Sequence, residues 1–144
     1  MVYQRAARRC GRLSGVTPAE LMSDYVAAAK RGDWGTAFGY FAEDIEFHIP
    51  GRSGLAGSRR GKAAAVDYIQ SVRDHYADGK IELELIDMLA SDERVALLVR
   101  ERFHGDGPPL EIRRANVYRV RGDQIVEIRI FEADQYAVDA LFGA

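Results

Sequence analysis

Apolar residues recur at helical spacing in the first half of the chain and alternate with polar residues in the second half. The first signal is Thr17-Pro18-Ala19-Glu20, which supplies an N-cap, a proline at the first helical position and a glutamate three residues after the cap. This capping box predicts the start of a helix, and Gly32 predicts its left-handed end. The apolar face of that helix comprises Leu21, Met22, Tyr25, Val26 and Ala29.

Further helices are predicted on both sides of the alternating region. Asp33 is the expected cap of a short helix that runs through Phe41, with an apolar face of Trp34, Ala37, Phe38 and Phe41. Lys62 to Tyr76 has helical periodicity and is closed by Asp78-Gly79; its inward positions are Ala65, Val66, Ile69, Val72 and Tyr76. A short helix from Asp134 to Phe142 ends the chain.

Strict alternation predicts the strands. Ile45, Phe47 and Ile49 alternate with Glu46 and His48, and the glycine-rich stretch 51–61 reads as a loop. Four longer strands follow, separated by turns: Lys80 to Leu89, Arg94 to His104, Leu110 to Arg121 and Gln124 to Glu132. Helices first and antiparallel strands afterwards predict an α+β fold in which helices pack on one face of a curved sheet.

Length and charge narrow the classes of function. The 144 residues suffice for one domain, which we place at 17–144. The net charge of −2 disfavours a nucleic-acid partner, and no apolar run is long enough to cross a membrane. Residues 1–16 are rich in arginine and are expected to be a disordered tail. Because no apolar stretch follows Arg8-Arg9, we expect a cytoplasmic protein and no export signal.

Several familiar cofactor patterns are missing. The stretch from Gly57 to Lys62 resembles a phosphate-binding loop, but alanine stands at both 56 and 63, where that motif requires glycine and serine or threonine. Three separated histidines and the single Cys10 lack the spacing of metal ligands, so no metal is expected. The same lone cysteine excludes an internal disulfide. We therefore predict no cofactor.

Several segments carry a family resemblance. They are SDYVAAAKRGD at 23–33, FAED at 41–44 and Pro50, together with GDQIVE at 122–127 and FEADQ at 131–135. The first three are similar, without a gap, to ketosteroid isomerases, and the last two resemble SnoaL-like proteins. Both groups share the cone-shaped, cystatin-like fold of nuclear transport factor 2, so the resemblance implies a cone whose concave face is covered by the N-terminal helices.

The resemblance also assigns catalytic positions. Tyr25 falls on the isomerase's oxyanion tyrosine, and Asn116 falls on its hydrogen-bond-donating aspartate; an asparagine can also donate. The position of the general base is Ile49, so the isomerase's own proton shuttle is not expected here. Limonene epoxide hydrolase, similar in the last two strands, needs an arginine and two aspartates where this chain has Leu97, Val99 and Ile130, so its mechanism is not expected either.

Alternation along the last strands then predicts the interior of the cone. It receives Val95, Leu97, Val99, Glu101 and Phe103 from one strand, Ile112, Arg114, Asn116, Tyr118 and Val120 from the next, and Val126, Ile128, Ile130 and Glu132 from the last. The hairpins bring Glu101, Arg114 and Glu132 together. This cluster is either a ligand contact at the end of an apolar pocket or a salt-bridge network at the rim of the sheet.

Other candidates also have two interpretations. His48 either lines the pocket as a general acid or base or lies at the rim or on the outer face. Glu132 is the other candidate for moving a proton. Tyr25 is either a hydrogen-bond donor to ligand or a core tyrosine. Trp34 and Phe41 are expected in the core and pocket wall, alongside the binding positions Val99, Tyr118, Ile128 and Ile130.

Three functions stay open at this point. The first is a cofactor-independent isomerase, cyclase, dehydratase or hydratase acting on a hydrophobic, polyketide- or steroid-like metabolite, with Tyr25, His48, Asn116 and Glu132 as its catalytic residues. The second is a binding protein for a hydrophobic small ligand, and the third is an assembly module. A mixed outer sheet face also leads us to expect a homodimer.

Overall fold

The computed structural model describes residues 15–75, 81–105 and 107–143. Most of the predicted N-terminal tail, and the predicted turn at Asp78-Gly79 with Tyr76, lie outside these residues. The helices are α2 (Pro18–Lys30), α3 (Trp34–Gly39), α4 (Lys62–His75) and α5 (Gln135–Leu141). None of the helices in the described ranges is long and apolar enough to span a bilayer.

Side-chain caps begin the first two helices, as the sequence predicts. The Thr17 hydroxyl accepts a hydrogen bond from the Glu20 amide at 3.1 Å, and the Asp33 carboxylate accepts one from the Thr36 amide at 3.2 Å. Gly32 lies after α2 with a φ of 77°, as a left-handed helix end requires. The predicted extent of α3 is wrong, because it ends at Gly39 and Phe41 begins a strand.

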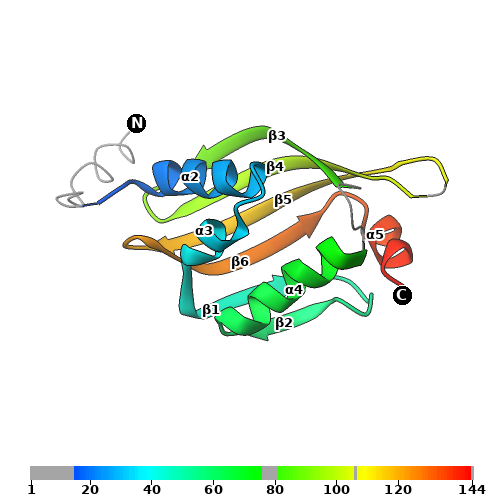
Figure 1. Cartoon of the computed structure of the whole chain (residues 1–144), viewed down its shortest axis with the longest axis horizontal. Coiled ribbons are helices and arrows are strands. Elements are labelled where there is room, and N and C mark those ends of the chain that lie inside the picture. Colours follow the sequence, from blue (N-terminus) through cyan, green and yellow to red (C-terminus); the bar gives the residue numbers. More distant parts are fainter. Residues whose placement is uncertain (1–14, 76–80, 106, 144) are drawn as a thin grey trace.

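Six strands form one sheet (Figure 1). Their order is β2-β1-β6-β5-β4-β3, and β1 runs parallel to β6, whereas the other neighbouring pairs are antiparallel. The predicted loop 51–61 contains a strand, because Gly57–Arg60 pairs with β1. The bounds are β1 (Phe41–Ile49), β2 (Gly57–Arg60), β3 (Ile81–Ala90), β4 (Arg94–Phe103), β5 (Leu110–Arg121) and β6 (Gln124–Glu132).

The register places the predicted polar residues side by side. Val99 is opposite Arg114, and Arg114 is opposite Glu132, as the hairpin lengths predict. One shift in register occurs where β5 meets β6, so Val120 pairs with Ile125. Ile125 therefore packs in the main core. Val126, which alternation predicts at the cone interior, is buried outside that cluster.

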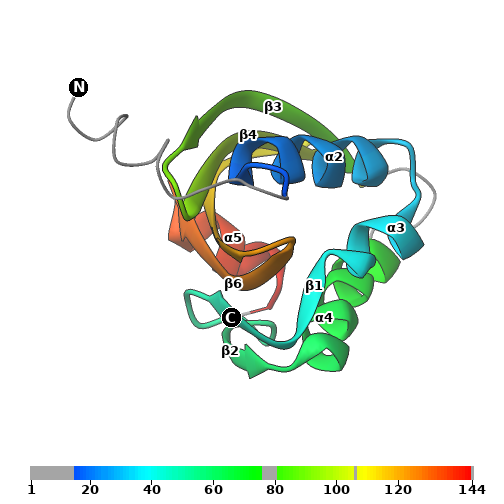
Figure 2. The ribbon, with the colours of Figure 1, turned by 90° about the vertical axis from the view of Figure 1, so that its left-hand side faces the viewer.

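The curvature of the sheet gives it a concave side that the helices cover. The sheet wraps around α2, α3 and α4, which lie on its concave side (Figure 2). Helix α2 contacts β3 and β4, whereas α4 contacts β1 and β2. A second cluster of Phe103, Ile112 and Val138 packs α5 against the sheet away from the main core. This α+β cone, with helices on its concave face, confirms the predicted fold.

Candidate functional site

A cavity of about 600 Å³ lies between α2, α4 and the concave face of the sheet. This volume falls within the range of ordinary small-molecule sites. Its wall is mainly apolar and aromatic, and its polar groups come from α2, α4, β4 and β5. Nine of the predicted site residues line it: Tyr25, Trp34, Val99, Glu101, Arg114, Asn116, Tyr118, Ile128 and Ile130.

Two tyrosines and an asparagine form the first polar group of the cavity. Tyr25 lies on α2 and Tyr118 on β5, with ring centroids 5.8 Å apart. The hydroxyls of Tyr25 and Tyr118 are hydrogen-bonded to each other, and Asn116 donates a hydrogen bond to the Tyr118 oxygen. Asn116 Oδ1 is buried and has no hydrogen-bond partner among the described residues, so a hydroxyl and a free acceptor lie side by side.

Burial keeps these phenols protonated. Desolvation raises the pKa of Tyr25 well above its usual value, and the neighbouring Tyr118 raises it further. Burial likewise raises the pKa of Tyr118, although its hydrogen bond from Asn116 acts in the opposite direction. Both side chains are neutral hydrogen-bonding groups at physiological pH, which suits stabilisation of a developing oxyanion.

The second polar group is the predicted cluster around Arg114. Arg114 Nε lies 2.9 Å from Glu132 Oε1, and its Nη1 lies 3.3 Å from Glu101 Oε1. The side chains are 8% exposed for Arg114, 12% for Glu101 and 2% for Glu132. Glu101 and Arg114 line the cavity, whereas Glu132 contacts Arg114 from behind it. The cluster is thus both a salt-bridge network and part of the cavity wall.

Two carboxylates share one guanidinium here, and the pKa values of Glu132 and Arg114 are shifted. Burial raises the pKa of Glu132, and Arg114 offsets this only in part. Burial opposes the charge of Arg114, but Glu101 and Glu132 outweigh it and raise the pKa of Arg114 above its usual value. Arg114 therefore stays charged and fixes the orientation of both carboxylates.

Tyr68 and Phe47 are among the wall residues that sequence reasoning missed. Tyr68 on α4 lines the cavity, packs edge-on against Phe47 at 4.9 Å between centroids, and faces the Arg114 cluster. Burial raises the pKa of Tyr68 to about 12. Its position three residues after Ala65 and four before Val72 could have revealed it, because these spacings share one helix face. Phe47, predicted only as a strand residue, also lines the cavity.

Three predicted site residues do not line this cavity. Phe41 is fully buried in the core beneath Tyr25, 5.9 Å away between ring centroids. Glu132 lies behind Arg114. His48 points to the opposite side of β1 from Phe47 and Ile49, so of the two positions that the sequence leaves open, the structure has the outer-face one.

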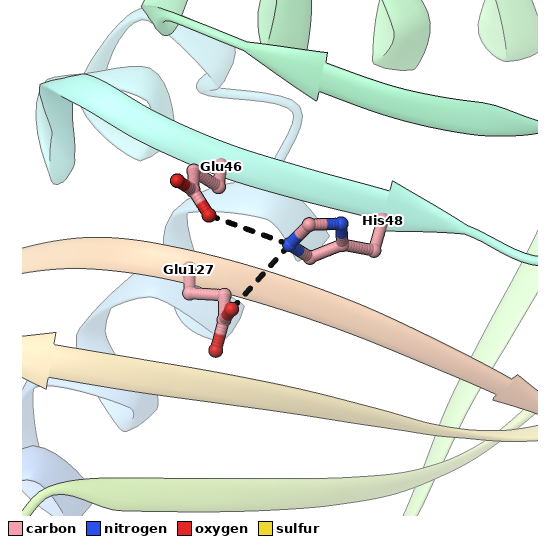
Figure 3. Close-up of side chains that lie close together, drawn as sticks. All are labelled: Glu46, His48 and Glu127. Carbon is pink, nitrogen blue, oxygen red and sulfur yellow. Dashed lines mark ion pairs between the residues drawn. The ribbon is translucent and has the colours of Figure 1, made fainter.

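On that outer face His48 has its own polar neighbours (Figure 3). Its Nδ1 lies 2.9 Å from the Ser58 hydroxyl. Its Nε2 lies 3.6 Å from Glu46 Oε2 and 3.4 Å from Glu127 Oε2. Strands β1 and β6 separate this group from the inner cavity, so His48 cannot transfer a proton to a molecule bound there.

A curved sheet that encloses an apolar cavity with a few converging polar groups defines a small-molecule cone of the nuclear transport factor 2 type. The SnoaL-like domain model matches residues 22–128, and the chain belongs to that family. An uncharacterised protein of Mycobacterium tuberculosis strain H37Rv is 32% identical over 125 residues, which cover 86% of this chain and 95% of that protein.

Solved structures agree with this assignment. Bal32a, from a soil-derived mobile gene cassette, is 27% identical with a TM-score of 0.79, covering 86% of this chain and 95% of its own. An NTF2-like protein of Burkholderia xenovorans LB400 is 26% identical with a TM-score of 0.69, covering 90% of this chain and all of its own. The resemblance found in the sequence to the NTF2-like and SnoaL-like proteins is thus confirmed.

Proposed function

We propose that this protein is a cofactor-independent enzyme that moves a proton on a hydrophobic small molecule bound in the inner cavity. The reaction class is isomerisation, cyclisation, dehydration or hydration of a polyketide- or steroid-like metabolite. One observation carries the proposal: the unpartnered Asn116 Oδ1 and the Tyr118 hydroxyl lie side by side in a wall that is otherwise mostly apolar. Such a wall suits a hydrophobic ligand with one oxygen function to be oriented.

Each polar residue has a distinct part in this proposal. Tyr118 donates to a ligand oxygen and Asn116 Oδ1 accepts from a ligand hydroxyl. Tyr25 is assigned a positioning role, because its hydroxyl is hydrogen-bonded to the Tyr118 hydroxyl. The resemblance to ketosteroid isomerases would instead make Tyr25 the direct donor.

Glu101 is the proposed proton carrier. Glu101 and Asp74 are the acidic side chains among the described residues of the cavity wall, and Glu101 shares its strand face with Leu97 and Val99. His48 cannot serve, because it lies on the other side of the sheet. Glu132 positions Arg114 from behind the wall. Glu101 is therefore the proposed proton carrier in place of His48 and Glu132.

A binding protein is the second candidate, and two observations favour it. The position that carries the general base in ketosteroid isomerases is Ile49, which is buried. Glu101 is already paired with Arg114 at 3.3 Å, so one of its oxygens has a partner within the protein. Under this alternative the same polar groups orient the ligand without chemical change.

The test combines binding and turnover. A panel of hydrophobic ketones, enols and hydroxylated polyketides is screened by thermal shift, and each binder is incubated and analysed by mass spectrometry and NMR for isomerised, cyclised or dehydrated product. We expect Tyr118→Phe and Asn116→Leu to weaken binding. Glu101→Gln should keep binding and lose at least about 10²-fold in kcat, the typical contribution of a general acid or base.

Glu111→Gln is the matched control, because it makes the same chemical change on a more exposed side chain of β5 that pairs with Arg102. Its turnover should equal that of the wild type. Ligand binding without any product in the wild type would favour the binding protein. Absence of binding across the panel would contradict both candidates.

A further inference from the structure

A second cluster of side chains lies on the outer face of the sheet, between the parallel strands β1 and β6 (Figure 3). Glu46, His48 and Glu127 each direct one ligand atom to a common point, and these atoms all lie within 4.8 Å of one another. His48 Nε2 is 3.6 Å from Glu46 Oε2 and 3.4 Å from Glu127 Oε2. The cluster is separate from the inner cavity.

The strand register itself creates an electrostatic problem at this point. Glu46 is directly opposite Glu127, and like charges in such a pair destabilise a sheet. Arginines contact the outer oxygens: Arg60 lies 3.0 Å from Glu46 Oε1 and Arg119 lies 3.7 Å from Glu127 Oε1. The inner oxygens of both glutamates face His48, so the space between the three side chains favours a positive charge.

His48 is oriented as a metal-ligating histidine is. Its Nδ1 is 2.9 Å from the Ser58 hydroxyl, which can accept from it and so fix the tautomer. Its Nε2 then carries a lone pair, and this atom is buried without a hydrogen-bond partner. The nitrogen lone pair and the two inner carboxylate oxygens therefore converge.

We propose that Glu46, His48 and Glu127 bind a divalent transition metal, with Zn²⁺ as the best fit. A tetrahedral Zn²⁺ with bonds of about 2.0–2.2 Å separates its ligand atoms by about 3.3–3.6 Å, and the two measured distances from Nε2 agree with this. One imidazole and two carboxylates suit Zn²⁺ better than the all-oxygen preference of Ca²⁺ or Mg²⁺. Water completes the coordination.

The bound metal would join β1 to β6, the parallel pair between which the glutamates oppose each other. It has a competitor, because Arg129 Nη2 lies 3.5 Å from the same Glu127 Oε2 that the metal needs. Arg129 is half exposed and can turn away, at a cost in affinity. The spacing of the histidines in the sequence predicts no metal site here. That spacing carries no information about the two carboxylates, which the sheet brings to His48.

The test is isothermal titration of the metal-free protein with zinc chloride at neutral pH, with thermal unfolding measured in parallel. We expect one Zn²⁺ per chain and a higher melting temperature with zinc. His48→Gln and Glu127→Gln should abolish this binding, and Ser58→Ala should weaken it about 10-fold or more, as loss of an outer-shell partner does. His104→Gln is the matched control, since His104 pairs with the single carboxylate of Glu82 at 3.1 Å, and it should bind as the wild type.

Arg129→Gln gives an independent test that does not depend on removing a ligand. Because it removes the competing guanidinium, it should tighten zinc binding, whereas a purely structural ion-pair network would gain nothing. The proposal is overturned if the wild type takes up no zinc, or if His48→Gln binds it as well as the wild type does. An unchanged affinity in Arg129→Gln would also count against the proposed geometry.

Discussion

At the scale of single residues, Arg114 links the stability of the fold to the cavity. It is 8% exposed and joins Glu101 to Glu132, which are 12% and 2% exposed. A buried ion pair is not by itself a strong source of stability, but losing one partner leaves the other charges without compensation. The same side chain therefore supports the fold and fixes the carboxylate that faces the cavity.

Replacing Arg114 tests its structural part. Arg114→Met should lower the free energy of unfolding by about 3–5 kcal/mol, because two buried carboxylates lose their shared partner. The matched control is Arg113→Met, the next residue on β5, whose exposed side chain pairs with Glu111 at 3.5 Å. It should change stability little. Urea denaturation measures the free energy of unfolding of both variants. Equal losses of stability would contradict a larger structural role for Arg114 than for Arg113.

The raised pKa of Glu132 predicts a pH dependence. In the range between the ordinary glutamate pKa and the raised value, the folded chain binds more protons at Glu132 than the unfolded chain does. The stability that this group contributes is therefore present at lower pH and falls as the pH rises through that range.

Urea unfolding of the wild type and Glu132→Gln at a series of acidic to neutral pH values checks this sign. The difference in free energy of unfolding, wild type minus variant, should decrease as the pH rises. An increase would mean that Arg114 outweighs burial and lowers the pKa of Glu132.

At the scale of elements, the sequence predicted most boundaries and missed those set by distant partners. Thr17, Gly32 and Asp33 act within a few residues, so the start and end of α2 and the start of α3 could be read directly. Strand β2 could not be predicted from local signals, because its four residues are ordered by pairing with β1. Phe41 lies in a strand and not in the predicted helix for the same reason. The Ile125 amide donates a hydrogen bond to the Tyr40 carbonyl at 2.7 Å, and β1 begins at the next residue.

The contact between the end of β1 and α5 gives an element-scale prediction. Gly51 has a φ of 99°, and a Cβ at this position would collide with Gln135 and Asp139 of α5. Gly51→Ala should lower the free energy of unfolding by more than the roughly 1–3 kcal/mol expected from backbone strain alone, because the two side-chain ends must move and lose their hydrogen bonds to the Arg52 amide and the Pro50 carbonyl. Gly57→Ala is the control, since Gly57 has a φ of 124° but open space around it. Equal losses of stability in urea denaturation would show that the side chains of α5 add no cost to a Cβ at position 51.

At the scale of the whole molecule, alternation and hairpin lengths were enough to place Glu101, Arg114 and Glu132 together and Asn116 beside Tyr118. The sequence alone left the side of His48 open, because that side depends on the partner strands of β1. The family resemblance identified Tyr25 but not its hydrogen bond with Tyr118. Both points needed the packed structure.

The predicted homodimer is a property of the whole molecule. Phe131 is 52% exposed on the face of β6 opposite the cavity, next to Ala115 and two residues from Arg129. We expect this outer face to pair two copies, so light scattering should give twice the 16.0 kDa mass of one chain. Phe131→Asp should shift the protein toward the monomer. A stable monomer of the wild type at micromolar concentration would contradict the prediction.

Native mass spectrometry of the freshly purified protein shows whether the inner cavity holds a small hydrophobic molecule. Ala29 of α2 lines the cavity, whereas Ala27 on the same helix is exposed. We expect a co-purified mass in the wild type and in Ala27→Trp, and its loss in Ala29→Trp, whose indole takes up space in the cavity. The same mass on Ala29→Trp, or an empty wild type, would contradict a ligand site at this place.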